Sequence, residues 1–549
     1  MSRRGTGDKD PGLTGPARGA WDWIVPIPSR TGPPARRTPL GSPWWRHSVC
    51  YQIYVRSFAD ANGDGVGDMA GIEQRLPYLA ELGVDSVWIT PFYTSPQHDH
   101  GYDVADYRNV DPLFGTLADF DAMLGRAHEL GIRVIVDLVP NHTSSEHPWF
   151  REALAGSPEA RERYVFRDGS GRDGDRPPNN WRSIFGGPAW TRVEDGQWYL
   201  HMFDGTQPDL NWWNPEVGDE FESILRFWLD RGVDGFRIDV AHGLYTPSDL
   251  ADRRRGERMP MWDQPEVHEV YRRWHKVLEE YDGDRMAVAE AWTDSPEAMA
   301  RYIRSDELQQ AFNFHWLGAR WSAAAFRDVV TETLAAVGLV DATATWVLSN
   351  HDVVRHVTRY GGGPVGLARG RAAVLTMLGL PGSSYIYQGE ELGLEQVEVE
   401  PEDRQDPAFF RGGQVGRDGC RVPMPWSGSV PPFGFGPGDG QPWLPQPQAW
   451  EDLTVQAQEQ DPDSTLSFYR TVLATRREVT AGIGDEVTIL RTAPGTLAFQ
   501  RGKALVCMVN CGSRNAKLPP EAGELILSSG PLGTPGMLPP DTAAWFRPV

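Results

Sequence analysis

The sequence Gly-Phe-Arg-Ile-Asp-Val at residues 235–240 places two opposite charges inside a short apolar stretch. If this stretch is a β-strand, Arg237 and Asp239 point to one face and Phe236 and Ile238 to the other, because side chains alternate along a strand. Two charges on a buried strand are costly to desolvate unless a functional site uses them. A structural ion pair is the alternative, and the rest of the chain has to decide between the two interpretations.

The chain around this stretch alternates apolar strands with amphipathic helices. One helix has Phe120, Leu124 and Ala127 at helical spacing, and Thr116 and Asp119 begin it like a capping box. Eight strand–helix units in succession predict a parallel sheet closed into a (β/α)8 TIM barrel. The predicted strands are residues 49–58, 86–90, 133–138, 235–239, 286–290, 310–314, 345–350 and 383–388.

Two segments depart from the regular alternation of strands and helices, and each predicts a further domain. The third and fourth strands are separated by a long, loop-rich segment, which predicts an inserted domain B at residues 141–211. Short strands at 487–490, 497–500, 505–510 and 524–527 predict a C-terminal antiparallel β-sandwich over residues 476–549. The barrel then comprises residues 43–140 and 212–475, and residues 1–42, rich in Pro, Gly and Arg, are predicted to be a flexible extension.

Composition restricts the partners. The formal charge of −22 and a pI near 5.0 argue against nucleic acid and against an anionic membrane surface, because both would be repelled. The sequence has no apolar run of membrane-spanning length and no signal-peptide core at its start, so we expect a cytoplasmic protein. The four cysteines have no zinc-binding spacing and are too few for a disulfide framework. A neutral small molecule is compatible with this charge.

Polar side chains lie where four of the predicted strands end. The third strand leads into Asp-Leu-Val-Pro-Asn-His at 137–142, and the fourth ends with Arg237 and Asp239. The fifth ends at Glu290, and the seventh leads into Ser-Asn-His-Asp at 349–352. Because the carboxyl ends of barrel strands meet at one rim, we expect these groups to form a single site there.

In order along the chain, segments 137–142, 235–242, 289–292 and 349–352 resemble the four signature regions of the α-amylase superfamily of retaining glycoside hydrolases. Gln-Pro-Asp-Leu-Asn at 207–211 resembles a further motif of the oligo-1,6-glucosidase and α-glucosidase branch. The resemblance runs from about residue 45 to the C-terminal domain and is strongest to actinobacterial α-glucosidases. It implies the same barrel, domain B and C-terminal sandwich.

The resemblance also implies residue roles. Asp239 corresponds to the nucleophile, Glu290 to the general acid/base and Asp352 to the third carboxylate, which holds substrate hydroxyls. Beside Asp239, Arg237 favours the ionised carboxylate that a nucleophile requires. Arg237 is grouped with His142 and His351 as substrate-binding residues. A retaining mechanism predicts about 5–5.5 Å between the carboxyl groups of Asp239 and Glu290.

Two segments resemble the parts that close the glucose pocket in exo-acting members: residues 101–107 and 416–419. We predict that Asp103 and Arg417 pair and bind the hydroxyls of the non-reducing glucose, and that Tyr102 stacks on its face. A closed pocket predicts release of single glucose units.

The segment 60–68, which follows the first predicted strand, carries oxygen side chains at alternate positions with intervening glycines, a pattern that suits a hard cation. It begins like an EF-hand loop but has Gly, not Glu, at its twelfth position. It resembles the metal loop of the α-glucosidase branch. We therefore predict structural Ca²⁺, with Mg²⁺ as an alternative and no organic cofactor. The predicted ligands are Asp60, Asn62, Asp64, Asp68 and the Val66 carbonyl.

Two neighbouring parts of the sequence favour different glycosidic linkages, α-1,6 and α-1,4. In the resembled branch, Val240 after the nucleophile is typical of α-1,6-active members, whereas the following Ala-His-Gly at 241–243 is more similar to α-1,4-active ones. We favour a retaining exo-acting α-glucosidase that releases glucose from short α-1,4-linked oligosaccharides such as maltose. The alternatives are an oligo-1,6-glucosidase, a transglucosidase, a sucrose or trehalose isomerase, an endo-acting amylase, or a non-catalytic relative like the amino-acid-transporter heavy chains.

Overall fold

The computed structural model describes residues 42–438 and 440–549 of the 549-residue chain. The extension predicted for residues 1–42 lies outside the described residues except for its last position. Among the residues described, no helix has the length and apolar character needed to cross a lipid bilayer.

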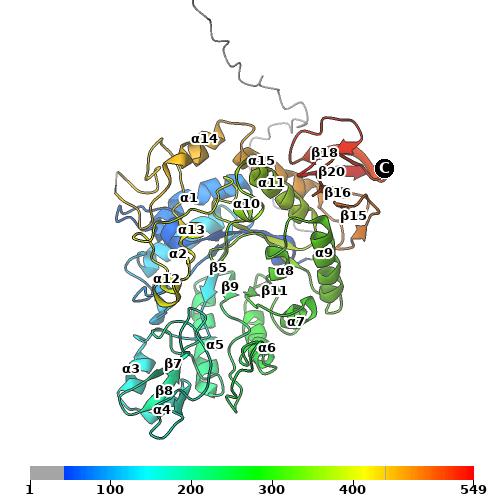
Figure 1. Cartoon of the computed structure of the whole chain (residues 1–549). Coiled ribbons are helices and arrows are strands. Elements are labelled where there is room, and N and C mark those ends of the chain that lie inside the picture. Colours follow the sequence, from blue (N-terminus) through cyan, green and yellow to red (C-terminus); the bar gives the residue numbers. More distant parts are fainter. Residues whose placement is uncertain (1–41, 439) are drawn as a thin grey trace, which may run out of the picture.

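Eight parallel strands form the centre of the molecule, as predicted (Figure 1). Their neighbour order is β11-β10-β9-β5-β2-β1-β13-β12. A parallel bridge between Phe312 and Thr345 joins the two ends of this series, so the sheet closes into a barrel. The strands are β1 (Val49–Ile53), β2 (Ser86–Ile89), β5 (Arg133–Leu138), β9 (Gly235–Ile238), β10 (Met286–Ala289), β11 (Gln310–Ala311), β12 (Thr345–Val347) and β13 (Ser383–Tyr387).

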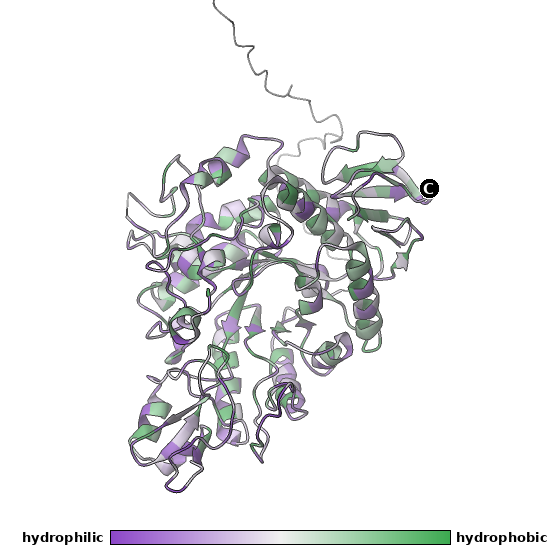
Figure 2. Cartoon of the chain, viewed as in Figure 1, coloured by the Kyte–Doolittle hydropathy of each residue, from purple (hydrophilic) through white to green (hydrophobic). Residues whose placement is uncertain are grey.

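Helices pack around the barrel and cover its outer face. In α2 the capping box of Thr116 and Asp119 is present as predicted, and the buried side chains lie on the face toward the strands. Figure 2 shows hydrophobic and hydrophilic residues along these helices, as expected of amphipathic helices with one side in solvent. The longer helices are α1 (Met69–Leu82), α2 (Leu117–Glu129), α5 (Pro215–Asp230), α6 (Val267–Glu279), α9 (Ala323–Gly338), α11 (Gly363–Gly379) and α15 (Thr465–Val479). The shorter ones are α7 (Pro296–Ala300), α8 (Phe314–Leu317), α10 (His356–Arg359), α12 (Pro407–Gly412), α13 (Asp418–Arg421) and α14 (Val455–Glu459).

The insertion after β5 forms a small domain. It contains α3 (Pro148–Leu154), α4 (Pro158–Glu162) and a three-stranded antiparallel sheet of β6 (Phe166–Asp168), β8 (Gln197–Leu200) and β7 (Trp190–Arg192). Buried Trp181, Trp190 and Leu200 belong to an apolar cluster that also contains Met259 and Met261 of the segment after β9. A short pair, β3 (Tyr93–Thr94) and β4 (Asp106–Val110), lies in the segment after β2. Domain B and the C-terminal strands lie at opposite ends of the molecule (Figure 1).

The C-terminal domain consists of two antiparallel sheets, in agreement with the predicted sandwich. Ala516 and Leu538 of the smaller sheet share an apolar cluster with Val506 and Phe546 of the larger one. Helix α15 continues to Val479, so the domain begins several residues after the predicted boundary. The last strand, β20, was not predicted. The larger sheet has the order β14 (Thr488–Ile489), β15 (Thr496–Arg501), β16 (Leu505–Asn510), β20 (Thr542–Pro548), β18 (Ala522–Ser528), and the smaller pairs β17 (Ala516–Lys517) with β19 (Met537–Leu538).

Candidate active site

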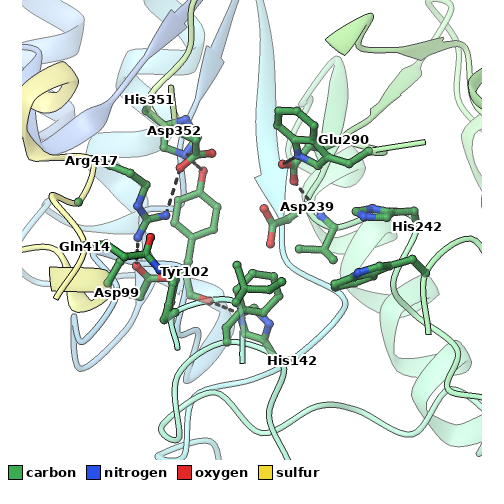
Figure 3. A pocket seen from close by; sticks show the side chains of 18 of the residues that line it. Asp99, Tyr102, His142, Asp239, His242, Glu290, His351, Asp352, Gln414 and Arg417 are labelled. Atoms are coloured by element: carbon green, nitrogen blue, oxygen red, sulfur yellow. Dashed lines mark hydrogen bonds and ion pairs between the residues drawn. The ribbon is translucent and has the colours of Figure 1, made fainter. Parts of the chain in front are cut away.

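The three predicted catalytic carboxylates lie in one cavity at the carboxyl-terminal rim of the barrel (Figure 3). Asp239 follows the last residue of β9, and Glu290 follows the last residue of β10. These strands are neighbours in register, so the two carboxylates are adjacent. Asp352 comes from the segment after β12. The cavity has a volume of about 700 Å³, large enough for a small oligosaccharide.

Arg237 is buried behind the cavity and contacts two of these carboxylates, Asp239 and Glu290, as well as Asp137. Its Nη1 lies 2.9 Å from Asp137 Oδ1 and 2.6 Å from Asp239 Oδ1, and its Nη2 lies 2.8 Å from Glu290 Oε2. Asp137 stands opposite Arg237 in the register of β5 and β9, which explains the first contact. Arg237 is buried and is not among the residues that line the cavity, so its role in substrate binding stays a prediction. Its contacts hold Asp239 and Glu290 in place.

The pKa of Asp239 differs from the expectation that Arg237 beside it favours the ionised carboxylate. Burial raises the pKa of Asp239, and the negative charges of Glu290 and Asp137 act in the same direction against the opposing effect of Arg237. Burial also raises the pKa of Asp137, to about 7. Asp239 and Asp137, which share the Arg237 guanidinium, therefore hold their protons more tightly than isolated carboxyl groups do.

Glu290 is held in place by the residues that follow Asp239. The backbone N–H of Val240 donates to Glu290 Oε2 at 2.9 Å, and the N–H of Ala241 donates to the Glu290 carbonyl at 2.9 Å. Val240 has φ of 45°, an unusual conformation for a β-branched residue. The indole Nε1 of Trp292 donates to the other carboxylate oxygen at 3.0 Å. Both oxygens of Glu290 are therefore oriented before any substrate binds.

A second arginine, Arg417, lies at one end of the cavity together with Asp99 and Asp352 (Figure 3). Arg417 places Nη2 at 2.9 Å from Asp99, Nη1 at 3.1 Å from Asp352 and Nε at 2.7 Å from Asp406. Burial alone would raise the pKa of Asp352, but His351, Arg417 and Arg421 outweigh it and lower that pKa well below its usual range. Asp352 is therefore ionised, as required of a carboxylate that accepts hydrogen bonds from sugar hydroxyls.

The structure corrects the predicted pairing of Asp103 with Arg417. Asp103 is fully buried, and its carboxylate accepts the backbone N–H groups of His98 and Asp99, each at 2.9 Å. Asp99, which comes four residues earlier, lines the cavity and forms the ion pair with Arg417. Asp99 was missed because both aspartates lie on irregular backbone, where no strand or helix period indicates which one faces the cavity.

The remaining predicted substrate residues line the same end of the cavity. Tyr102 stacks on His351 with a centroid distance of 5.4 Å and an interplanar angle of 7°, and its hydroxyl lies 2.7 Å from His351 Nε2. His142 Nε2 lies 3.1 Å from the Tyr102 carbonyl. Burial lowers the pKa of His142 to about 4 and that of His351 well below its ordinary value. Both imidazoles are therefore neutral hydrogen-bonding groups at neutral pH.

The predicted cation loop is closed by its own backbone. Asp60 accepts the N–H groups of Gly63 and Gly65, and Asp68 accepts that of Gly71 as the N-cap of α1. Asn62 accepts the N–H of Asp64 in the same way. Within residues 42–438 and 440–549, no group of three or more acidic, histidine or cysteine side chains converges as a metal site. The calcium ion therefore stays a prediction, which would use lone pairs that these bonds leave free.

Comparison with known proteins agrees with this geometry. The α-amylase catalytic domain model matches residues 52–482. The chain belongs to the α-amylase catalytic domain family. As a member of this family it is a glycoside hydrolase, built on the barrel and site described above.

Three relatives of this α-amylase family member span nearly the whole chain. A probable alpha-glucosidase of Rhizobium meliloti (strain 1021) is 41% identical over 507 residues, which cover 86% of this chain and 90% of that protein. The trehalose-6-phosphate hydrolase of Escherichia coli (strain K12) is 36% identical over 520 residues, covering 88% and 93%. The crystal structure of an alpha-glucosyl transfer enzyme, XgtA, superposes with a TM-score of 0.83 at 40% identity, covering 92% of this chain and all of that one.

Proposed function

We propose that this chain is a retaining exo-α-glucosidase that releases glucose from the non-reducing end of short α-1,4-linked oligosaccharides such as maltose. The observation that carries the proposal is the ion-paired end of the cavity. Arg417, Asp99 and Asp352 lie there on one side of Asp239 and Glu290, together with Tyr102 and His142. These groups suit the hydroxyls of a single terminal sugar.

In the proposed reaction, Asp239 attacks the anomeric carbon of that glucose while the carboxyl of Glu290 gives its proton to the glycosidic oxygen. The bond to the leaving sugar breaks, and a glucosyl ester forms on Asp239. Glu290, now ionised, takes a proton from water, and the resulting hydroxide equivalent displaces Asp239 with overall retention. Arg237 holds both carboxylates throughout, because it contacts both.

The test is a side-by-side assay on maltose, isomaltose, sucrose, trehalose and soluble starch. We expect maltose to be the best substrate, starch to be poor and the first-released glucose to be the α-anomer by NMR. Turnover of isomaltose alone would overturn the linkage assignment but not the mechanism. Release of β-glucose would overturn the retaining mechanism, and activity in an Asp239→Asn variant would remove Asp239 as the nucleophile.

A second candidate function is α-glucosyl transfer. It is supported by the similarity to an alpha-glucosyl transfer enzyme and by apolar side chains exposed at the cavity, Ile184, Trp292 and Val415, at 47%, 42% and 73% exposure. An apolar mouth favours an organic acceptor over water at the glucosyl ester. Chromatography of products formed at high sugar concentration distinguishes the two functions, since transfer yields oligosaccharides longer than the substrate.

We also propose that the loop at 60–68 binds a structural Ca²⁺. The proposal is supported by the alternation of oxygen-bearing side chains with glycines in that loop. The ion would act on stability, because the loop leads directly into the N-cap of α1.

A further inference from the structure

The cavity has a second half on the far side of the catalytic carboxylates. In Figure 3, Asp239 and Glu290 lie between the Arg417–Asp99 pair and His242. If glucose occupies the Arg417 end, the bond to be broken lies at the carboxylates. The leaving group must therefore occupy the half that contains His242. None of the residues predicted from the sequence to bind substrate belongs to this half.

Aromatic rings form one wall of this half. Trp262 and His242 both line the cavity, and their rings stack at a centroid distance of 4.7 Å and an interplanar angle of 29°. Trp262 belongs to the long segment between β9 and α6 and is half-buried. The next residue, Asp263, donates its backbone N–H to the His242 carbonyl at 2.7 Å. The carboxylate of Asp263 is held by Arg301 at 2.6 Å and by the Tyr302 hydroxyl at 2.7 Å.

The Trp262 ring also packs closely against Gly243, which restricts its position. A Cβ atom added to Gly243 would lie 2.4 Å from the Trp262 ring and 2.8 Å from Cγ1 of Val240. Gly243 thus lets the indole approach the chain that follows the nucleophile. The ring is held by stacking on one side, by its neighbour Asp263 and by this close approach, so it is preorganised.

We propose that Trp262 is the platform on which the leaving-group sugar stacks, and that it is a specificity-determining residue for that ring. This inference rests on the proposed glucosidase function and adds the recognition of the second sugar. An indole offers a large, rigid apolar face to the C–H face of a pyranose. Since Trp262 lies beside Val240, which follows the nucleophile, its plane sets the angle at which the second ring leaves the bond.

The experiment compares two substrates on Trp262→Ala and Trp262→Phe variants. Maltose carries a second ring, whereas α-glucosyl fluoride carries none. An aromatic contact of about 0.5–1.5 kcal/mol corresponds to about a 2- to 13-fold change. We expect Trp262→Ala to lower kcat/KM for maltose within that range, mainly through KM, while kcat/KM for α-glucosyl fluoride stays near wild type. Trp262→Phe should recover most of the maltose activity.

Gly243→Ala provides an independent test that leaves the indole in the chain. Its added methyl group displaces the Trp262 ring and also meets Cγ1 of Val240, so we expect some loss on both substrates and a clearly larger loss on maltose. Equal losses on both substrates in folded Trp262→Ala and Gly243→Ala enzymes, or no loss on either, would overturn the proposal. Wild-type enzyme that hydrolysed neither substrate would instead overturn the proposed function. Circular dichroism and Tm establish that each variant is folded, and Gly243→Ala carries the test if Trp262→Ala does not fold.

Discussion

Replacing Asp99 by Asn tests which aspartate of the segment after β2 serves the substrate. The substitution keeps the shape of the side chain but removes the charge that lies 2.9 Å from Arg417. Arg417 retains Asp352 and Asp406, so the fold should persist. A hydrogen bond to a charged group contributes about 1.5–3 kcal/mol, which corresponds to about a 10- to 160-fold loss of kcat/KM on maltose.

Asp103→Asn is the matched control for Asp99→Asn. The Asp103 carboxylate accepts two backbone N–H groups, whereas an amide offers one oxygen and turns its own NH₂ toward the other donor. The expected cost is about 1–3 kcal/mol of folding free energy, which lowers Tm by a few degrees. Because Asp103 does not line the cavity, we expect its kcat/KM to stay close to wild type.

The assay is steady-state hydrolysis of maltose for both variants, with Tm measured on the same preparations. We expect opposite outcomes, with activity lost in Asp99→Asn and stability lost in Asp103→Asn. The assignment would be refuted if Asp103→Asn lost the greater activity at unchanged Tm while Asp99→Asn remained active.

Three other predictions concern the acid/base, the buried carboxyls and the cation. Glu290→Gln should lower kcat on maltose about 10²- to 10⁴-fold. It should affect the first step on α-glucosyl fluoride far less, because fluoride needs no proton to leave. Equal losses on the two substrates would contradict the role of Glu290 as the acid. Burial raises the pKa of Glu390 to about 8, so the folded protein binds a proton at Glu390 more tightly than the unfolded chain does. This proton binding contributes to the free energy of unfolding in full at acid pH, and the contribution is lost as the pH rises through about 8. Between pH 5 and 8 the loss should reach about 1.4 kcal/mol per pH unit, and a Tm–pH curve for Glu390→Gln no flatter than wild type would argue against it. Ca²⁺ at about 100 times its Kd should raise the free energy of unfolding by about 2.7 kcal/mol. EDTA should remove this stabilisation, and Asp64→Asn should abolish the response to Ca²⁺. A Tm that changes with neither Ca²⁺ nor EDTA would rule out the site.

The barrel and the placement of Asp239 and Glu290 at its rim could be predicted because both depend on strand geometry. Asp239 and Glu290 directly follow apolar runs, so the strands themselves carry them to the rim. Asp99 and Asp103 lie instead in a loop where Gln97, His100 and Gly101 all have positive φ, and no period indicates which carboxylate turns inward.

Two further contacts could not be read from the sequence for a different reason. Asp137 lies in the segment 137–142 at the end of the third predicted strand, but its ion pair with Arg237 follows from the register between β5 and β9, which becomes known only with the sheet. Trp262 lies in an irregular segment that precedes α6, so neither helical nor strand spacing marks it. Sequence periodicity thus locates residues at strand ends, and three-dimensional contacts are needed for those in the loops.

The glucose end of the cavity has a consequence for how the enzyme is made. Arg417 and Asp99 are separated by 318 positions along the chain, yet they form one ion pair. During synthesis, domain B and the strands β9 and β10 leave the ribosome long before Arg417 does, and domains begin to fold as they emerge. A nascent chain that already displays both Asp239 and Glu290 therefore still lacks the sugar-binding end of its cavity. Hydrolytic capacity arrives only when nearly all of the barrel has been translated.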